Sequence, residues 1–273
     1  MLGNWSNQII HGDCFDILPQ LPPDSVDMIY WDPPYFQQLE EDRIRLQGGK
    51  VARSVDEDWD KFESLEEYEG FIQRGLSELQ RTLKPTGSLW ISGSYHCIHL
   101  IGYHAQKMGM WFFSELIWQK IGPRPNFREV RPIQSHEQLL WLCKDRASAK
   151  LVARKKYRHD IMVSLGLSDH GRESLMTQWA IPICRGNERL KRADGVRLHS
   201  TQKPVELVRR MISVCTEPGD LILDPMAGTG TTAVAATHLR RDFLVIEQVE
   251  QYVVAAKGRV RAVGPFDIVN SDA

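Results

Sequence analysis

The apolar residues of this chain follow two patterns. Short, nearly continuous apolar runs are typical of strands buried on both faces, whereas apolar residues spaced three or four apart are typical of amphipathic helices. The runs predict strands at 8–11, 26–31, 88–92, 111–119, 138–143, 220–223 and 243–246. The spaced pattern predicts helical turns at 15–21 and helices at 64–83, 96–108, 204–214, 231–239 and 251–260. This alternation predicts an α/β fold with a mostly parallel sheet and helices on both of its faces.

The predicted helix 64–83 also carries start and stop signals. Ser64 can cap the first turn of the helix. Glu66 and Glu67 lie in that turn, where their negative charges interact favourably with the positive end of the helix dipole. The stretch 84–87, with its proline and glycine, is expected to stop this helix before the next strand at 88–92.

Two segments lack either pattern. Residues 36–59 are long for a loop in a compact domain, and we interpret them as a lid beside the turn at 32–35. Residues 145–198 are weakly periodic, and we interpret them as an insertion outside the sheet. Residues 36–69 hold 11 acidic and 5 basic side chains, and residues 145–197 hold 12 basic and 6 acidic ones. The basic segment can attract a polyanion locally, although a solvated charged face is the simpler interpretation.

Composition narrows the classes of protein. The 273 residues suffice for one large α/β domain with insertions or for two small ones. A net charge of −1 argues against a simple basic nucleic-acid binder. No apolar run is long enough for a membrane span, and no secretory signal begins the chain. The 5 cysteines are scattered and form no Cys-x-x-Cys pair, so neither a zinc site nor a disulfide framework is indicated, and we expect a cytoplasmic protein.

The motif Asp32-Pro33-Pro34-Tyr35 directly follows the predicted strand 26–31. Neither proline can donate a ladder hydrogen bond, so the strand ends there and leaves Asp32 and Tyr35 at its carboxyl edge, where open α/β sheets bind ligands. The motif offers a carboxylate, the free carbonyl of Pro33 and a flat aromatic ring. This set suits a planar ring with an exocyclic amine, because the amine's two protons need two acceptors. A strand followed by a surface turn is the simpler alternative.

A second motif lies near the other end of the chain, where residues 221–232 read as a strand, a glycine-rich turn and a helix start. Gly228 and Gly230 allow a ligand to approach the backbone, and the helix N-terminus offers free N–H groups. Glu247 ends the next strand and could accept hydrogen bonds from ribose hydroxyls. No Lys follows the glycines, which excludes a phosphate-gripping P-loop. The unit therefore indicates an adenosine-containing cofactor.

Taken together, the chain resembles the β-class amino-group DNA methyltransferases, which use S-adenosylmethionine. The matching stretches, in that family's order, are 12–13, 32–35, 59–62, 81–87, 136–137, 199–204 and 224–232. They span almost the whole chain. The resemblance implies a circularly permuted Rossmann-like methyltransferase fold in which the catalytic turn precedes the cofactor glycines. Met226 stands where the family more often has Phe, which leaves the cofactor assignment intact.

The resemblance also implies the site residues. The catalytic set would be Asp32, Pro33, Pro34 and Tyr35. The cofactor would be held by Asp13, Cys14, Asp32, Thr201, Gln202, Lys203, Pro204, Asp224, Pro225, Met226, Ala227, Gly228, Thr229, Gly230, Thr231 and Glu247. Its adenine would lie near Asp13, its ribose on Glu247 and its methionine end near 224–230. No metal is expected, because no carboxylate or Cys completes a set with His96, His99 and His104.

The implied reaction is direct methylation of a base flipped out of the duplex, without a covalent enzyme intermediate. Tyr35 would stack on the base, while Asp32 and the Pro33 carbonyl would accept its amine protons. Asp rather than Ser at position 32 favours adenine-N6 over cytosine-N4. A cytosine-N4 enzyme, a catalytically silent DNA-binding relative and an RNA or small-molecule methyltransferase remain alternatives. The chain has no Pro-Cys dipeptide, which argues against carbon-5 methylation of cytosine.

The implied domains are a catalytic half at 1–144 with a mobile loop at 36–60, a target-recognition insertion at 145–198, and a cofactor-binding half at 199–273. The candidates for DNA contact are Arg154, Lys155, Lys156, Arg158, Arg189, Lys191 and Arg192. The expected partners are double-stranded DNA, a second copy of the chain in a homodimer, and a cognate restriction endonuclease that acts separately.

Overall fold

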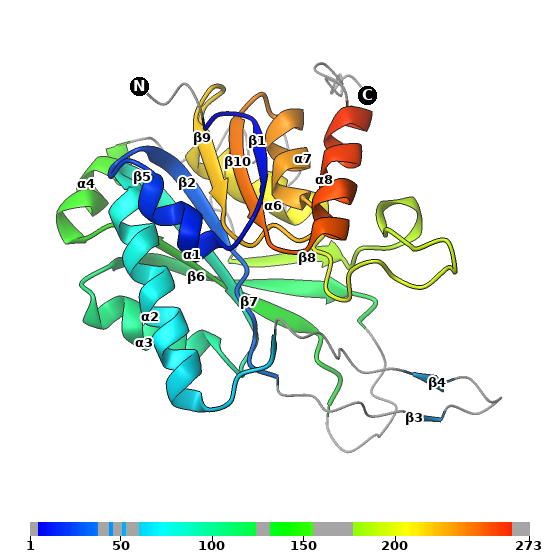
Figure 1. The fold of residues 1–273 in the computed structure, drawn as a ribbon. Helices are drawn as coiled ribbons and strands as arrows, with labels where there is room; N and C mark the ends of the chain where they lie inside the picture. The colour runs from blue at the N-terminus through cyan, green and yellow to red at the C-terminus, as the bar shows by residue number, and fades with distance from the viewer. Residues whose placement is uncertain are drawn as a thin grey trace, which may run out of the picture.

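The computed structural model describes residues 5–37, 44–45, 51–52, 60–123, 132–154 and 177–263. Its centre is an eight-stranded sheet covered by helices on both faces (Figure 1). Across the sheet the strands are β1 (Gln8–His11), β10 (Asp242–Glu247), β9 (Leu221–Asp224), β2 (Val26–Trp31), β5 (Leu83–Gly93), β7 (His136–Cys143), β6 (Trp111–Ile121) and β8 (Gln178–Pro182). Strand β7 runs antiparallel to both neighbours, and the other pairings described in this sheet are parallel. The predicted α/β class with a mostly parallel sheet is therefore confirmed.

The helices divide between the two faces. One group packs on the face that Ile29 and Trp31 of β2 cover, and the other on the face that Met28 and Tyr30 cover. The first group is α1 (Cys14–Ile17), η1 (Leu18–Gln20), α2 (Leu65–Thr82) and α3 (Ile98–Lys107). The second contains α6 (Val205–Cys215) and α7 (Thr231–His238), beside which lies α8 (Glu250–Val263). Because both faces are covered, all six residues of β2 are buried, which accounts for the continuous apolar run in the sequence.

Helix α2 shows how local signals place the core. The Ser64 side chain accepts a hydrogen bond from the Glu67 N–H at 3.1 Å, so the predicted N-cap is confirmed. Buried residues then recur three or four positions apart along one face of the helix. Gly75 lies on that face against the Trp31 ring, where a Cβ atom would come within 2.7 Å of the ring. This close approach fixes Trp31, the last residue of β2 before the Asp32 turn.

Two sequence-based interpretations are wrong in part. Helix α2 ends at Thr82, as the stop signal at 84–87 predicts, but the strand predicted at 88–92 begins earlier, at Leu83, which pairs with Val26 of β2 before a register irregularity. The segment 145–198 does not lie wholly outside the sheet. Its residues Gln178–Pro182 form the edge strand β8, and α4 (Arg146–Arg154) packs on β5, β6 and β7. In β8 only Trp179 and Ile181 point inward, a two-residue alternation too short to stand out in the sequence.

Some expectations concern regions with few described residues. Within the predicted lid, the structure describes residues 36–37 at its beginning and the antiparallel pair β3 (Ile44–Arg45) and β4 (Val51–Ala52). Its role as a lid stays a prediction. Among the described residues, no group of three or more His, Cys, Asp and Glu side chains could hold a metal ion. Across the same residues, every helix is too short or too polar to cross a membrane.

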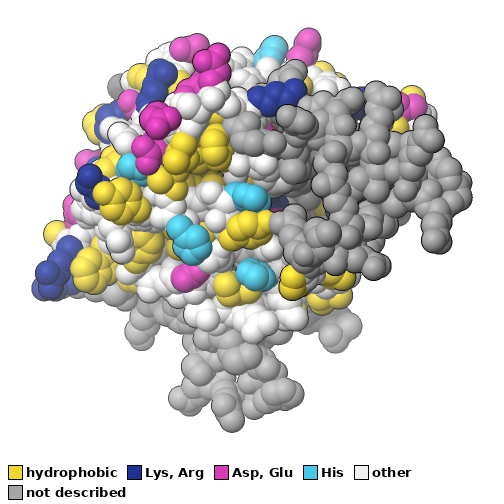
Figure 2. All heavy atoms as spheres, turned by 90° about the horizontal axis from the view of Figure 1, so that it is seen from below, with side chains coloured by type: hydrophobic (Ala, Val, Ile, Leu, Met, Phe, Trp, Pro, Cys, Tyr) yellow, Lys and Arg dark blue, Asp and Glu magenta, His cyan; other side chains and the backbone are white. Residues whose placement is uncertain are grey.

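The surface seen from below adds one observation (Figure 2). Its described part mixes hydrophobic, histidine and polar side chains, and its Lys and Arg side chains are scattered. This face therefore carries no continuous basic patch among the described residues.

We expect Gly75→Ala to lower the free energy of unfolding by about 1–3 kcal/mol, because the new methyl group must displace the Trp31 ring. The change should destabilise the protein although Ala is the better helix former by about 1 kcal/mol. Urea denaturation measures the difference.

The matched control is Gly70→Ala in the same helix, where a Cβ atom meets nothing within 4 Å. That variant should be as stable as the original protein or more stable, by up to about 1 kcal/mol. Equal stabilities for the two variants would show that the contact between Gly75 and Trp31 does not constrain the fold.

Candidate active site

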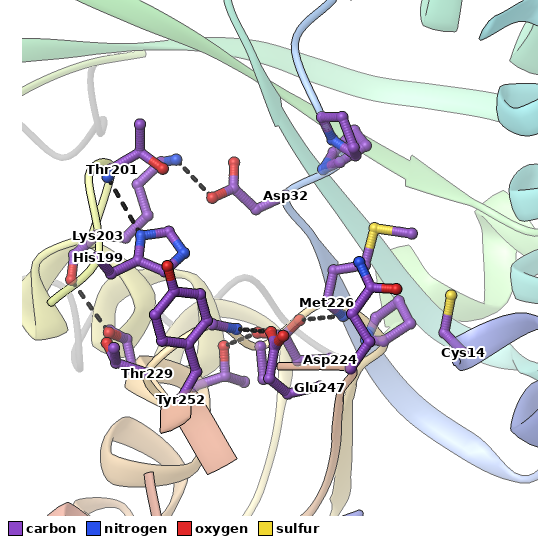
Figure 3. Close-up of a pocket in the computed structure, with 18 of the residues that line it drawn as sticks. Cys14, Asp32, His199, Thr201, Lys203, Asp224, Met226, Thr229, Glu247 and Tyr252 are labelled. Atoms are coloured by element: carbon purple, nitrogen blue, oxygen red, sulfur yellow. Dashed lines mark hydrogen bonds and ion pairs between the residues drawn. The ribbon is translucent and has the colours of Figure 1, made fainter. Parts of the chain in front are cut away.

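A cavity of about 250 Å³ opens at the carboxyl ends of β1, β2, β9 and β10. These four strands run parallel, so the residues that follow each of them meet at one edge of the sheet. Figure 3 shows the two predicted motifs facing each other across this space, with Asp32 on one side and Asp224 and Glu247 on the other. Segments from the beginning and the end of the chain thus form one site.

Most of the predicted site residues line this cavity. The four residues 32–35 do so, together with Asp13, Cys14, Thr201, Gln202, Lys203, the whole stretch 224–229, Thr231 and Glu247. Pro204 and Gly230 do not line it, because each instead occupies the N-cap position of a helix, α6 and α7 respectively. Gly230 has a φ of 76°, and a Cβ atom there would lie 2.5 Å from the Ala256 side chain, so this glycine is required by the packing of α7 on α8.

Asp224 supports the glycine-rich turn from inside. One carboxylate oxygen accepts a hydrogen bond from the Met226 N–H at 3.1 Å, and the other accepts one from the Thr232 hydroxyl at 2.5 Å. Burial raises the pKa of the Asp224 carboxyl to about 7, although these two hydrogen bonds act in the opposite direction. Asp224 therefore connects the end of β9 to the first turn of α7.

Glu247 holds the other side of the turn. Its two oxygens accept hydrogen bonds from the Gly228 and Val249 N–H groups, each at 2.8 Å. Burial raises the pKa of this carboxyl, and the backbone hydrogen bonds oppose the shift. Each oxygen keeps a further lone pair for a hydroxyl ligand in the cavity.

His199 and Tyr252 are cavity residues to which the sequence analysis gave no role. The His199 ring lies 4.8 Å from the Tyr252 ring, and its Nδ1 accepts a hydrogen bond from the Thr201 N–H (Figure 3). Burial, and to a lesser extent the Lys203 charge, lowers the pKa of His199 to about 4, so the ring is neutral near pH 7. The edge of this ring packs on Gly228, where a Cβ atom would come within 2.9 Å of Nε2. Tyr252 belongs to the buried stripe of α8, which is why the sequence gave it no functional signal.

Asp32 is held by three donors. Its Oδ1 accepts hydrogen bonds from the Ser92 hydroxyl at 2.5 Å and from the Tyr35 hydroxyl at 2.8 Å. Its Oδ2 forms an ion pair with the Lys203 ammonium at 2.5 Å (Figure 3). The Lys203 side chain is only 7% exposed, and it lies 5.0 Å above the centre of the Tyr35 ring. The sequence analysis assigned Lys203 to the cofactor, whereas the structure gives it Asp32 as partner.

Glu137, on β7, completes this cluster. The Tyr35 hydroxyl lies 2.9 Å from its Oε2, so Glu137 and Asp32 share the one proton that this hydroxyl can donate. Glu137 also pairs with Lys120 at 2.7 Å and lies 3.6 Å from the Lys203 ammonium. Burial acts to raise the pKa of Glu137, but Lys203 and Lys120 outweigh it and lower the pKa below its usual value. The same two acids, Asp32 and Glu137, raise the pKa of Lys203 against the effect of burial. The pair 136–137 was a matching stretch in the sequence, but nothing there showed that Glu137 reaches Lys203.

A second cavity of about 240 Å³ adjoins the first. Tyr35, Gln37 and 201–203 line both, and the second cavity is further lined by Tyr95, His96, Trp118, Lys120, Glu137 and Arg189, among others. The Lys203 and Tyr35 side chains therefore stand between two spaces. One has the glycine-rich turn in its wall, and the other has aromatic and basic side chains.

The predicted DNA-contacting residues are only partly described. Arg154 ends α4, and its side chain lies outside the described part, as do Lys155, Lys156 and Arg158. Arg189 donates a hydrogen bond to the Cys184 carbonyl and lines the second cavity. Lys191 and Arg192 are exposed on the turn that follows, which the Arg192 N–H closes by bonding to the Val196 carbonyl.

Comparison with known proteins identifies the family. Residues 26–258 match the model of the N6/N4 DNA methylases. The chain is 37% identical to the type II methyltransferase M.HinfI of Haemophilus influenzae over 97% of its own length and 71% of that protein. It is 36% identical to the type II methyltransferase M2.DpnII of Streptococcus pneumoniae over 93% of its own length and 89% of that protein.

Two solved structures share the fold. The M1.HpyAVI–SAM complex is 25% identical, with a TM-score of 0.64 over 93% of this chain and 98% of that one. The PvuII DNA methyltransferase, described as cytosine-N4-specific, is 18% identical, with a TM-score of 0.66 over 93% and 86%. The second likeness concerns the fold alone. From the matches in sequence, the chain belongs to the N6/N4 family of DNA methylases.

Proposed function

We propose that this protein methylates the exocyclic N6 amine of an adenine in double-stranded DNA, with S-adenosylmethionine as the methyl donor. One observation carries the proposal: the Asp32–Tyr35 turn and residues 224–229 of the glycine-rich turn border a single cavity. An acceptor for an amine and a pocket for an adenosine-containing cofactor therefore lie within reach of each other.

The residues of the first cavity fit this cofactor. Gly228 has a φ of 52°, and the absence of a side chain there lets the His199 ring pack against the turn in the wall of the cavity. Glu247 offers two oxygens for ribose hydroxyls, Asp13 and Cys14 border the adenine position, and 224–229 border the methionine end. When bound, the cofactor supplies an electrophilic methyl group. The protein's own part is to orient the nucleophile toward it.

Asp32 and the Pro33 carbonyl are the acceptors that orient the amine. Hydrogen bonds from its two protons to these oxygens direct the nitrogen lone pair away from them and toward the first cavity. The negative charge of Asp32 favours the positive charge that develops on nitrogen as the new bond to carbon forms. Burial raises the pKa of the Tyr35 hydroxyl well above its ordinary value, so this hydroxyl remains a donor that holds Asp32 in place.

The adenine assignment rests on Asp at position 32, since cytosine-N4 members of this family more often have Ser there. We assign the ring of the flipped base to the second cavity, because Tyr35 and Lys203 join that cavity to the first. The DNA backbone is assigned to the loop around Lys191 and Arg192 and to the undescribed basic residues of 145–198. The domain roles, the homodimer and the separate restriction endonuclease stay predictions.

Asp32→Ala should reduce methyl transfer by at least about 100-fold, because the amine loses its charged acceptor. Cofactor affinity should persist, since Glu247 and the glycine-rich turn are unchanged. Transfer of a labelled methyl group to DNA and calorimetric titration with S-adenosylmethionine measure the two effects. The control is Asp242→Ala at the opposite end of β10, which removes an exposed hydrogen bond from Asn7 and should leave transfer unchanged. Substantial turnover by Asp32→Ala would remove this residue from the mechanism.

The product distinguishes the two amine substrates. DNA from cells that express the protein, digested to nucleosides and analysed by mass spectrometry, should contain N6-methyladenine. DNA from cells that express Asp32→Ala provides the background. Finding N4-methylcytosine without N6-methyladenine would overturn the adenine assignment and leave the amine chemistry intact.

Replacing both Lys191 and Arg192 with Ala should weaken DNA binding at every sequence and reduce the slope of log affinity against log salt by about 0.9 for each phosphate that is no longer neutralised. The matched control removes two exposed charges from α8, Lys257→Ala with Arg261→Ala. Anisotropy titrations at several salt concentrations give both slopes. Identical slopes for the two double variants would place the DNA elsewhere.

A further inference from the structure

The Lys203 ammonium occupies the position that the proposed function gives to the target amine. Its nitrogen lies 2.5 Å from Oδ2 of Asp32, the acid assigned to accept an amine proton. It also lies 5.0 Å from the centre of the Tyr35 ring, the surface assigned to the base. The Tyr35 side chain is buried, so its ring face is not open to a base in this state. In this structure, then, Lys203 covers both groups.

Asp32 has little acceptor capacity left beside this ion pair. Oδ1 already accepts from Ser92, and it shares with Glu137 the one proton that the Tyr35 hydroxyl can donate. Oδ2 is therefore the oxygen that an incoming amine can use, and Lys203 holds it. An amine bound to Oδ2 beside the ammonium would have a full positive charge next to its nitrogen. Since that nitrogen itself becomes positive during methylation, the neighbouring charge would oppose the reaction.

Glu137 offers Lys203 another partner. Its Oε2 already forms a long ion pair with the Lys203 ammonium at 3.6 Å, so a small rotation of the lysine side chain would shorten this pair to hydrogen-bonding distance. The Glu137 carboxyl is ionised, because Lys203 and Lys120 hold its pKa below the usual value. It lies in the wall of the second cavity, away from the glycine-rich turn. The ammonium can thus leave Asp32 without being left buried and unpaired.

We propose that Lys203 is a positioning residue that holds Asp32 in the free protein and transfers to Glu137 when the target amine binds. This inference rests on the proposed function, because it concerns the same amine and the same acid. It assigns Glu137 the role of a receiving partner, which keeps the ammonium charge away from the nucleophile. Neither residue needs to touch the reacting atoms.

A double-mutant cycle tests the dependence of Glu137 on Lys203. Glu137→Gln should lower the single-turnover rate of methyl transfer by about tenfold or more, because the ammonium then stays on Asp32. In a Lys203→Met background no ammonium remains to be received, so adding Glu137→Gln should change the rate by less than about twofold. Cofactor affinity should be the same for Glu137→Gln as for the original protein, because Glu137 does not line the first cavity.

The control is Lys84→Met, which removes the comparable ion pair with Asp27 between β2 and β5, at a lysine–carboxylate distance of 2.7 Å. In that background Glu137→Gln should keep its full effect. If Glu137→Gln slows transfer equally in the Lys203→Met background, Glu137 acts only through the structure and the inference is wrong. An unchanged rate for Glu137→Gln in the original protein has the same consequence.

A structure of the unmodified protein with target DNA and a non-reactive cofactor analogue gives a direct readout that needs no variant. Lys203 should lie within about 3.2 Å of Glu137 and beyond hydrogen-bonding distance of Asp32. An ammonium that remains on Asp32 beside a bound amine would overturn the inference while leaving the proposed function standing. If the unmodified protein transfers no methyl group to DNA, the proposed function and this inference fail together.

Discussion

The ion pair between Asp32 and Lys203 is the interaction on which the site depends. It joins residues 171 positions apart, one in the turn after β2 and the other just before α6. Both side chains are largely buried, and a charge in such a place is tolerated only with a partner, since loss of one member of a buried pair costs about 3–5 kcal/mol. Glu137 and Lys120 extend the pair to two acids and two bases. The cluster is therefore electrically balanced and still has one ammonium between two possible partners.

The cofactor side of the cavity is constructed differently. There the acids bind the protein's own backbone: Asp224 accepts from the Met226 N–H, and Glu247 accepts from the Gly228 and Val249 N–H groups. The glycine-rich turn is thereby fixed before any ligand arrives, which reduces the conformational entropy lost on binding. A pre-organised pocket beside an exchangeable ion pair suits a two-substrate reaction. In the proposed function, the cofactor binds a turn that is already fixed, whereas the target amine must displace Lys203 from Asp32.

The sequence predicted those parts of this arrangement that local pattern controls. Strand β2 has the predicted bounds, because it is buried on both faces and ends at two prolines. The two motifs lie in one cavity as expected, because parallel strands bring their carboxyl ends to one edge. The contacts between residues far apart in the sequence could not be predicted from the local pattern of apolar and polar positions. The partner of Lys203 and the buried position of Glu137 depend on the insertion of β7 between β5 and β6. Strand β8 was missed because only two of its side chains point inward, which is too short a pattern to predict a strand. The family resemblance assigned Pro204 and Gly230 to the cofactor because they belong to matching stretches, whereas the structure places each at the N-cap of a helix and outside the lining of the cavity.

In the proposed function, different residues contact the exocyclic amine of the target base and the ring of that base. Asp32, the Pro33 carbonyl and the Lys203 ammonium act only at the exocyclic amine, a group that adenine and cytosine share. Asp32 therefore supports the adenine assignment through family resemblance and not through a contact with the ring. The identity of the ring must then be set by side chains that touch its other edges. Tyr95, His96 and Arg189 in the wall of the second cavity are placed to do so, since they share that cavity with Tyr35 but do not line the first cavity. A change of base preference within such a fold should therefore arise in the second cavity, while the charged cluster that prepares the amine is kept.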